Sequence, residues 1–392
     1  MNHFRCVLAL MAFFFIALNL MGQPNLKEKK TIVYQDENIE IREGKTQVII
    51  PLHFSEHPAT SLFKLKNGDL ILYTSPAAFK MTTAISMRSK DGGQTWQQAI
   101  SKIQNNYDGH YWGNSFTSLS EPACQLPDGE IIQFGGWFGK ETSDEGVYLF
   151  PFFRWNNDAT KGIHEEAVMR LPTFLIRGPW PNHSIVIAGD GSLLASVQGR
   201  FPFDNTTRTF IVRSTDQGRT WNFLSNVAID KESKFIKGNG YCEPDLLILP
   251  TGRILCFMRT SGSIPGTPIY LSSSDDDGQT WTEPTPITKF GVYPGSCLMQ
   301  NGVIALCYGR PGDWMTFSLD NGMTWIGNVE IKHNKPENTQ IEKETEAPDA
   351  GHYNSIQEVE PGKLLLVYAR SYMRDKKQSE IIGTFIYVRR IK

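Results

Sequence analysis

The sequence lacks an excess of charge of either sign. Its 39 lysine and arginine residues nearly balance its 41 aspartate and glutamate residues, and no basic stripe is visible. Proteins that bind nucleic acid usually carry clustered positive charge, so nucleic acid is not expected as a partner. The sequence also lacks an amphipathic helical stretch of useful length, which argues against a fold of alternating strands and helices.

Cysteine is scarce, and its spacing does not suggest a metal site. Cys6 lies near the N-terminus, and the other five cysteines are Cys124, Cys242, Cys256, Cys297 and Cys307. No Cys-x-x-Cys pair or His-rich stretch provides the spacing of metal ligands. All five lie in or beside apolar runs, so we expect buried free thiols, no metal ion and no cofactor.

The sequence has no apolar run long enough to be a typical membrane span. Arg5 precedes an apolar run from Val7 to Leu20, which is rich in Phe and Leu and has no basic flank after it. This pattern is typical of a secretory signal peptide over residues 1–22, cleaved near Gly22. We therefore expect a secreted or periplasmic protein with no membrane span after signal removal.

The sequence does contain a hairpin pattern that occurs six times. Each copy has a polar start, an apolar run, a turn with glycine and a second apolar run, as from Tyr241 to Thr260. The copies start at His57, Glu121, His183, Glu243, Tyr293 and Tyr353. Their turn glycines are Gly68, Gly129, Gly191, Gly252, Gly302 and Gly362, spaced 61, 62, 61, 50 and 60 residues apart. Antiparallel hairpins at this period are typical of propellers or solenoid arrays.

A second motif alternates with the hairpins. Its four copies span Ser89–Trp96, Ser214–Trp221, Ser274–Trp281 and Ser318–Trp325. Each contains Ser, Asp, Gly, Thr and Trp at fixed spacing. The Asp side chain can accept backbone N–H bonds inside a turn, and Gly permits a positive φ. We therefore interpret the motif as a structural turn rather than as a metal or sugar site.

These four motifs are identified as the Asp-box, or bacterial neuraminidase repeat, of the sialidase superfamily. The resemblance extends from about Thr60 to the C-terminus. It implies an all-β fold, a six-bladed β-propeller of four-stranded antiparallel blades with Asp-box turns, in a single domain over residues 23–392. The second blade has only a degraded box at residues 155–158, and the last blade has none. We expect residues 31–52 to supply an outer strand that closes the ring.

The repeat also predicts where a site lies. The innermost strand of each propeller blade starts near the axis, so repeat-start residues of different blades converge on one face. In the clearest hairpin, Glu243 and Arg259 should emerge at the same end and hold an oriented polar ligand. The other strand-end arginines that can point to this centre are Arg200, Arg310 and Arg370.

The resemblance to sialidases implies roles for these residues. Tyr353 resembles the catalytic nucleophile and Glu243 its partner base. Arg259 and Arg310 resemble two of the three arginines that hold the substrate carboxylate, because planar guanidinium groups bind carboxylates at two points. The further substrate-binding residues that we predict are Arg200, His183, Asp245 and Tyr293.

The chain departs from the sialidase pattern in the first blade. Sialidases carry Arg-Ile-Pro where this chain has His57-Pro58, and residues 75–83 contain no carboxylate for the general acid. Arg200 or Arg370 would then complete the arginine cluster. The candidates for the acid are Glu121, Asp108 and His183, of which we assign Glu121 as catalytic.

These features favour a secreted sialidase-like exo-glycoside hydrolase that acts on terminal acidic sugars, sialic acid or a related sugar, of glycans or glycoconjugates. One alternative is a non-catalytic glycan-binding propeller that keeps the pocket without the acid. Another is a propeller polysaccharide lyase with a His or Tyr base, for which His57, His183 and His352 are candidates.

Overall fold

The regular elements of this chain are β-strands arranged in antiparallel sheets. The computed structural model describes residues 30–53, 59–74, 85–105, 118–136, 139–232, 235, 240–260, 267–310, 312–331, 353–371 and 379–392, and these contain no helix. The predicted signal peptide, residues 1–22, lies outside the described residues. Within them, no helix is long and apolar enough to cross a membrane.

Three sheets have four strands each, in chain order. The first contains β3 (Thr60–Lys64), β4 (Leu70–Thr74), β5 (Ile85–Ser89) and β6 (Gln97–Gln98). The second contains β17 (Cys242–Ile248), β18 (Ile254–Arg259), β19 (Tyr270–Ser274) and β20 (Thr285–Pro286). The third contains β21 (Val292–Leu298), β22 (Ile304–Gly309), β23 (Asp313–Ser318) and β24 (Ile326–Glu330).

A ten-stranded sheet joins two antiparallel groups. One group has β8 (Ala123–Gln125), β9 (Ile131–Phe134), β10 (Lys140–Glu141), β11 (Val147–Trp155) and β12 (Lys161–Arg170). The other has β13 (Arg177–Ile187), β14 (Leu193–Arg200), β15 (Arg208–Ser214) and β16 (Thr220–Ala228). Parallel pairings of β8 with β13 and of β12 with β16 join the groups, and β7 (Lys102–Asn105) pairs with β12.

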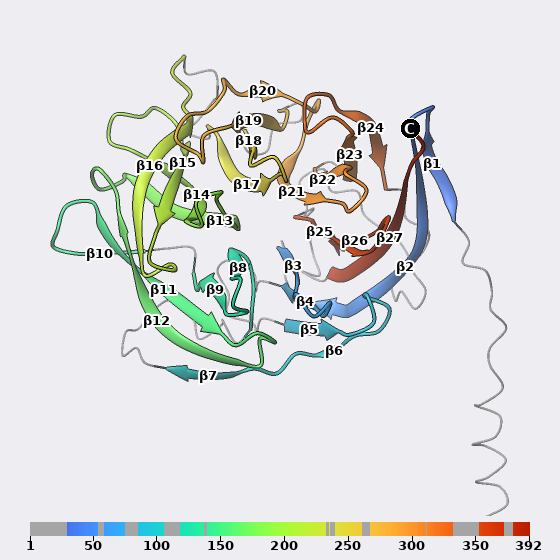
Figure 1. Ribbon diagram of the computed structural model, residues 1–392, viewed down its shortest axis with the longest axis horizontal. Helices are drawn as coiled ribbons and strands as arrows, with labels where there is room; N and C mark the ends of the chain where they lie inside the picture. The colour runs from blue at the N-terminus through green and yellow to red at the C-terminus, as the bar shows by residue number, and fades with distance from the viewer. Residues whose placement is uncertain are drawn as a thin grey trace, which may run out of the picture.

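The fifth sheet joins the two ends of the described chain. Its order is β1 (Thr31–Gln35), β2 (Ile39–His53), β27 (Ser379–Arg390), β26 (Lys363–Ser371) and β25 (Ser355–Glu360). β2 pairs with β27 in antiparallel fashion along most of its length. In Figure 1 the blue β2 and the red β27 run side by side at the edge of the molecule. The expected closing strand is therefore confirmed, because residues 31–52 complete the last sheet.

All six predicted hairpins are present as antiparallel pairs, from β3–β4 to β25–β26. Every one of the six turn glycines has a positive φ, between 75° and 99°. A Cβ atom at Gly68, Gly191 or Gly252 would meet nothing within 4 Å, so space alone does not require glycine there. The backbone conformation favours glycine, because an L-residue with a positive φ has an unfavourable steric contact between its Cβ atom and the backbone.

The four Asp-box motifs form turns, as predicted. In the second copy, Asp216 accepts hydrogen bonds from the Ser214 hydroxyl at 2.7 Å and the Thr220 N–H at 2.8 Å. The Trp221 indole N–H donates to the Gly218 carbonyl at 2.9 Å. The other copies repeat this Ser–Asp–Thr pattern. The boxes therefore stabilise the hairpin turns with their own side chains.

The hydrophobic core lies between neighbouring sheets, and the strands explain why. On β26, Leu364 and Leu366 pack with residues of the β21–β24 sheet, whereas Leu365 and Val367 pack with residues of the β3–β6 sheet. Successive side chains of a strand point to opposite faces, so a continuous apolar run fits a sheet that is buried on both faces. The five cysteines of the described residues are free; Cys256, Cys297 and Cys307 are buried as expected, whereas Cys124 and Cys242 are half-buried.

The inner strands surround the centre of the molecule. Figure 1 shows β3, β8, β13, β17, β21 and β25 around this centre, with the other strands outside them. β13 contacts β8 and β17, β21 contacts β17 and β25, and β25 contacts β3. The Glu121 N–H donates to the Ser61 hydroxyl at 2.9 Å and connects β3 with the segment before β8. The starts of these strands therefore face a common axis.

Candidate active site

Three repeat-start residues adopt the same unusual backbone conformation. His183, Glu243 and Tyr293 have φ values of 44°, 47° and 50°. Each lies where the pairing register of its hairpin shifts, that is, in a β-bulge. A non-glycine residue in this region costs about 1–2 kcal/mol, and bulges often re-aim side chains near active sites. The bulge therefore explains how three different blades present one side chain each to the centre.

Tyr353, Glu243 and Arg259 form a hydrogen-bonded group at this centre. The Tyr353 hydroxyl donates to Glu243 Oε1 at 3.1 Å. The Arg259 guanidinium donates to the same oxygen at 2.6 Å and to the Tyr353 hydroxyl at 3.2 Å. The Arg259 side chain is 8% exposed and that of Glu243 is 16% exposed. The structure thus brings the predicted nucleophile, base and arginine into direct contact, although they lie up to 110 residues apart.

The charges around Tyr353 act in both directions on its hydroxyl. Burial raises the pKa of Tyr353 above its usual value and the Glu243 carboxylate adds to this rise, whereas Arg259 and Arg310 oppose it. The Arg310 guanidinium lies over the Tyr353 ring, 5.5 Å from the ring centre. The resting phenol is therefore protonated, with a carboxylate positioned to take its proton and two arginines positioned to stabilise the phenolate.

A second group of predicted residues adjoins the first. His183 Nδ1 lies 3.7 Å from Glu121 Oε2. The His183 ring is 4.0 Å from the Tyr293 ring, and the Tyr293 ring meets the Tyr353 ring edge-on at 4.3 Å. Tyr293 therefore connects the Glu121–His183 pair with the group around Tyr353.

The electrostatics of the Glu121–His183 pair suit proton exchange. Burial raises the pKa of Glu121, and His183 only partly offsets this effect. Burial lowers the pKa of His183, but Glu121, Asp245 and Glu243 together raise it above its usual value. A carboxyl that keeps its proton to higher pH is the usual form of a general acid.

Asp245 has its carboxylate buried beneath this centre, with 3% of the residue exposed. One carboxylate oxygen accepts hydrogen bonds from the Ser296 N–H at 2.8 Å and the Ser296 hydroxyl at 2.6 Å, and the other accepts one from the Ser184 hydroxyl. These contacts join β13, β17 and β21. The predicted contact of Asp245 with substrate stays a prediction, and the contacts present connect three inner strands.

Arg200 has a hydrogen bond to a neighbouring loop rather than to one of these groups. It ends β14, and its Nε donates to the Asp204 carbonyl at 3.0 Å. Arg310 directly follows β22, with a φ of 61°. The remaining candidates His57, Asp108, His352 and residues 75–83 lie outside the described residues, as does the side chain of Arg370.

Sequence reasoning missed the polar residues that support the centre. The Gln198 side-chain oxygen accepts a hydrogen bond from the Glu243 N–H, and Ser184 and Ser296 hold Asp245. Ser184 directly follows a repeat start, so the repeat alignment was a usable signal for it. Gln198 and Ser296 lie inside strands, where no sequence signal distinguished them.

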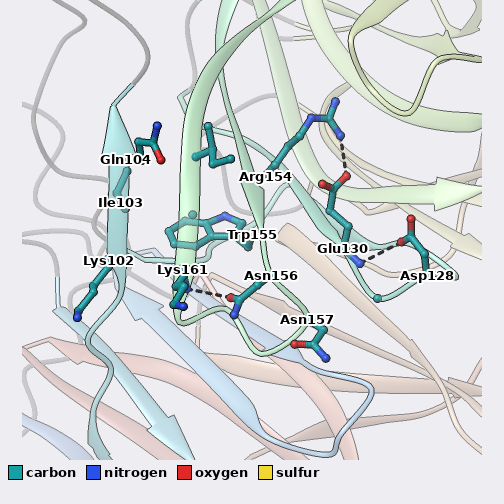
Figure 2. A pocket seen from close by; sticks show the side chains of 13 residues that line it. Lys102, Ile103, Gln104, Asp128, Glu130, Arg154, Trp155, Asn156, Asn157 and Lys161 are labelled. Carbon is teal, nitrogen blue, oxygen red and sulfur yellow. Dashed lines mark hydrogen bonds and ion pairs between the residues drawn. The ribbon is translucent and has the colours of Figure 1, made fainter.

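A hollow of about 740 Å³ lies at a different place, between β7, β12 and the two turns β8–β9 and β11–β12. Figure 2 shows that its polar side chains bind one another, as Arg154 does with Glu130 at 2.8 Å. None of the predicted catalytic or substrate-binding residues lines it. The chemistry that the repeat predicts is therefore gathered at the centre and not in this hollow.

The comparisons with known proteins agree with the repeat and the fold. A family model described as a BNR repeat-like domain matches residues 143–333. The matched segment is just under half of the chain and contains three of the four Asp-box turns, so it supports the interpretation of these motifs as BNR repeats. No curated protein sequence matches the chain.

Several solved structures have a similar fold. A protein of unknown function from Dyadobacter fermentans is 18% identical, with a TM-score of 0.60 over 89% of this chain and 99% of that one. An α-L-arabinofuranosidase from Fusarium graminearum is 14% identical, with a TM-score of 0.61 over 88% and 97%. The sialidase of Trypanosoma rangeli is 13% identical, with a TM-score of 0.50 over 91% and 59%. Identities this low establish the fold alone.

Proposed function

We propose that this protein is a secreted exo-glycoside hydrolase of sialidase type that removes terminal acidic sugars, sialic acid or a related sugar, from glycans. The observation that carries the proposal is the contact of Tyr353 with Glu243 and Arg259, at 3.1 Å and 3.2 Å. Glycoside hydrolases among the structures of similar fold support the general class. Six inner strands around one axis support a six-bladed propeller, in a single domain over residues 23–392.

In the proposed reaction, Tyr353 attacks the anomeric carbon while Glu243 takes the phenolic proton. The bond from the anomeric carbon to the leaving oxygen breaks, and Glu121 gives its proton to that oxygen. Water then hydrolyses the glycosyl–tyrosine bond, with Glu121 as the base, and Tyr353 regains its proton from Glu243. A neutral phenol approaches an anionic sugar without the repulsion that an attacking carboxylate would meet.

Arg259 and Arg310 are proposed to hold the carboxylate of the sugar. Arg259 lies 2.6 Å from Glu243, and Arg310 lies over the Tyr353 ring, so both guanidinium groups border the place where the sugar would sit. Guanidinium forks bind carboxylates with two parallel hydrogen bonds. His183, Tyr293, Asp245 and Arg200 are proposed as further substrate-binding residues.

The test is hydrolysis of the fluorogenic methylumbelliferyl glycoside of N-acetylneuraminic acid by the purified protein. Turnover should be lost in Tyr353→Phe and Glu243→Ala. A protein that is silent on sialosides and on uronosides would overturn the proposal. Binding to a glycan array without turnover would instead favour the non-catalytic glycan-binding propeller, and products that absorb in the ultraviolet would favour the polysaccharide lyase.

A further inference from the structure

The third hairpin is longer than its neighbours at the end that faces the site. The last paired residues of β8–β9 are Ala123 and Gln133, and those of β17–β18 are Cys242 and Arg259. In β13–β14 the pairing continues past the bulge, through Trp180 with Gln198 to Arg177 with Arg200. We call this part, residues 177–181 and 197–200, the hairpin extension. The pairing of β13 with β14 therefore continues further past the repeat start than the pairing of the two neighbouring hairpins.

The hairpin extension lies next to the catalytic carboxylate. Gln198, on the extension, accepts the hydrogen bond of the Glu243 N–H, which fixes the two segments side by side. Trp180 is the cross-strand partner of Gln198 and is half-buried. The exposed Arg177 guanidinium lies over the Trp180 ring, 5.1 Å from the ring centre. The extension therefore places an aromatic ring and a cation at the rim of the site.

Two arginines are paired across the strands at the end of this extension. Arg177 and Arg200 are direct cross-strand partners, an arrangement that is unfavourable for like charges. Arg200 donates to the Asp204 carbonyl, and the Asp204 carboxylate pairs with Arg208. Among the described residues, no carboxylate forms an ion pair with Arg177 or Arg200. An anion held between the two guanidinium groups would remove the repulsion.

We infer that Arg177, Arg200 and Trp180 form a subsite for the leaving group of the substrate, and that this leaving group carries a carboxylate or a sulfate. The inference rests on the proposed function. The sugar that is cleaved lies against Tyr353, Arg259 and Arg310, so the rest of the glycan must leave the centre over the rim. The hairpin extension lies at this rim, because its Gln198 contacts the backbone of Glu243. Trp180 provides a surface on which a sugar ring can pack, and the arginines bind its anionic group.

The experiment compares two substrates with the same terminal sugar. Disialic acid has a leaving group with a carboxylate, and sialyllactose has a neutral one. We expect wild-type protein to have a higher kcat/KM for disialic acid, and Arg177→Gln to reduce the ratio of the two values by about three- to tenfold, mainly through KM. Arg177→Lys should reduce it less, because it keeps the charge and loses the fork. Sialyllactose with a sulfate on its lactose unit, in place of disialic acid, tests sulfate.

The matched control is Arg170→Gln. Arg170 is an exposed arginine at the end of β12, in an outer strand. This variant should keep the wild-type ratio of the two substrates. An unchanged ratio in Arg177→Gln, or equal losses on both substrates, would overturn the subsite.

Equilibrium binding separates this inference from the proposed reaction. Calorimetric titration of the same saccharides into wild-type protein and Arg177→Gln needs no turnover. If wild-type protein binds disialic acid more tightly than sialyllactose and Arg177→Gln does not, the subsite is supported even if hydrolysis is absent. Equal affinity of both proteins for both saccharides would reject it, whatever the hydrolysis assay gives.

Discussion

Tyr353 and Arg259 both donate to one oxygen of Glu243, and the separate roles of the three residues follow from this arrangement. Glu243 Oε1 accepts the Tyr353 hydroxyl and the Arg259 guanidinium at 3.1 Å and 2.6 Å. The arginine holds the carboxylate in place, so that the same oxygen is positioned to accept the phenolic proton. Removal of either the Tyr353 hydroxyl or the Glu243 carboxylate should therefore stop the same step, the proposed attack of Tyr353 on the sugar.

The hydroxyl of Tyr353 can be tested by itself. Tyr353→Phe removes one oxygen and keeps the ring against Tyr293. We expect kcat to fall by on the order of 10³-fold or more, since a nucleophile and its base act as a unit. The double variant Tyr353→Phe/Glu243→Gln should fall little further. The control is Tyr34→Phe. The Tyr34 hydroxyl bonds to Asp36, and both residues lie far from Tyr353 in the sequence, so this variant should keep wild-type kcat.

The pH profile tests the role of Glu121. Burial raises the pKa of Glu121 above that of an ordinary glutamate, about 4.3. A general acid works only while protonated, so activity should be lost as the pH rises through this raised pKa. His183→Asn removes a positive charge that lowers the pKa of Glu121, and asparagine tolerates the positive φ at this position. The alkaline limb of kcat/KM should therefore move to higher pH.

Opposite results would contradict this assignment. If the alkaline limb stays in place in His183→Asn, or moves to lower pH, Glu121 is not the acid that His183 influences. Glu121→Gln should abolish the limb and leave a slow, pH-independent rate at alkaline pH. An aryl glycoside with a very acidic leaving group should restore part of the activity of this variant, because it needs no proton.

At the scale of one element, the bulge at three of the repeat starts, His183, Glu243 and Tyr293, holds a non-glycine residue at a strained positive φ. Glu243 has a φ of 47°, where a glycine would be unstrained. Glu243→Gly should therefore have a free energy of unfolding about 1 kcal/mol higher than Glu243→Ala. Chemical denaturation of the two variants measures this difference.

The control for this comparison is an ordinary strand position. Gln357 lies inside β25, and its φ is not among the positive values found in the described residues. There the order should be reversed, with Gln357→Gly less stable than Gln357→Ala, because glycine weakens a strand. The same order at both positions would mean that the bulge is not strained.

The local elements and the convergence of the repeat starts were readable from the sequence, whereas the other contacts between strands were not. Turn glycines such as Gly252 and box residues such as Asp216 act within a few residues, so the sequence predicts the hairpins and the boxes. The convergence of Tyr353, Glu243 and Arg259 followed from the repeat. The roles of Gln198 and Ser296 depend on strands from different blades lying side by side, which no local pattern encodes. The extension that carries Arg200 depends on continued pairing past a bulge, which the repeat alignment hid.

At the scale of the whole molecule, the sheet that joins the two ends holds the structure together. Ile41 on β2 is fully buried, in the core between this sheet and the β21–β24 sheet. Ile41→Ala should lower the free energy of unfolding by about 2–4 kcal/mol. Denaturant unfolding, followed by tryptophan fluorescence and by circular dichroism, should show one shared transition at a lower midpoint.

Ile32 provides the matched control for this prediction. It lies on β1 in the same sheet and is 47% exposed. Ile32→Ala should change the free energy of unfolding by less than about 1 kcal/mol. Equal losses for the two variants, or separate transitions for different probes, would mean that the joining sheet is not part of one cooperative unit.

The pairing of β2 with β27 also has a consequence for biosynthesis. A ribosome makes β2 long before β27, so for most of translation the edge of β2 that will pair with β27 has no partner strand. Its apolar residues must then be shielded by a chaperone or held unfolded until the final residues emerge. A premature stop codon anywhere before Ser379 would leave the β27-facing edge of β2 unpaired, and the truncated polypeptide should be degraded rather than accumulate.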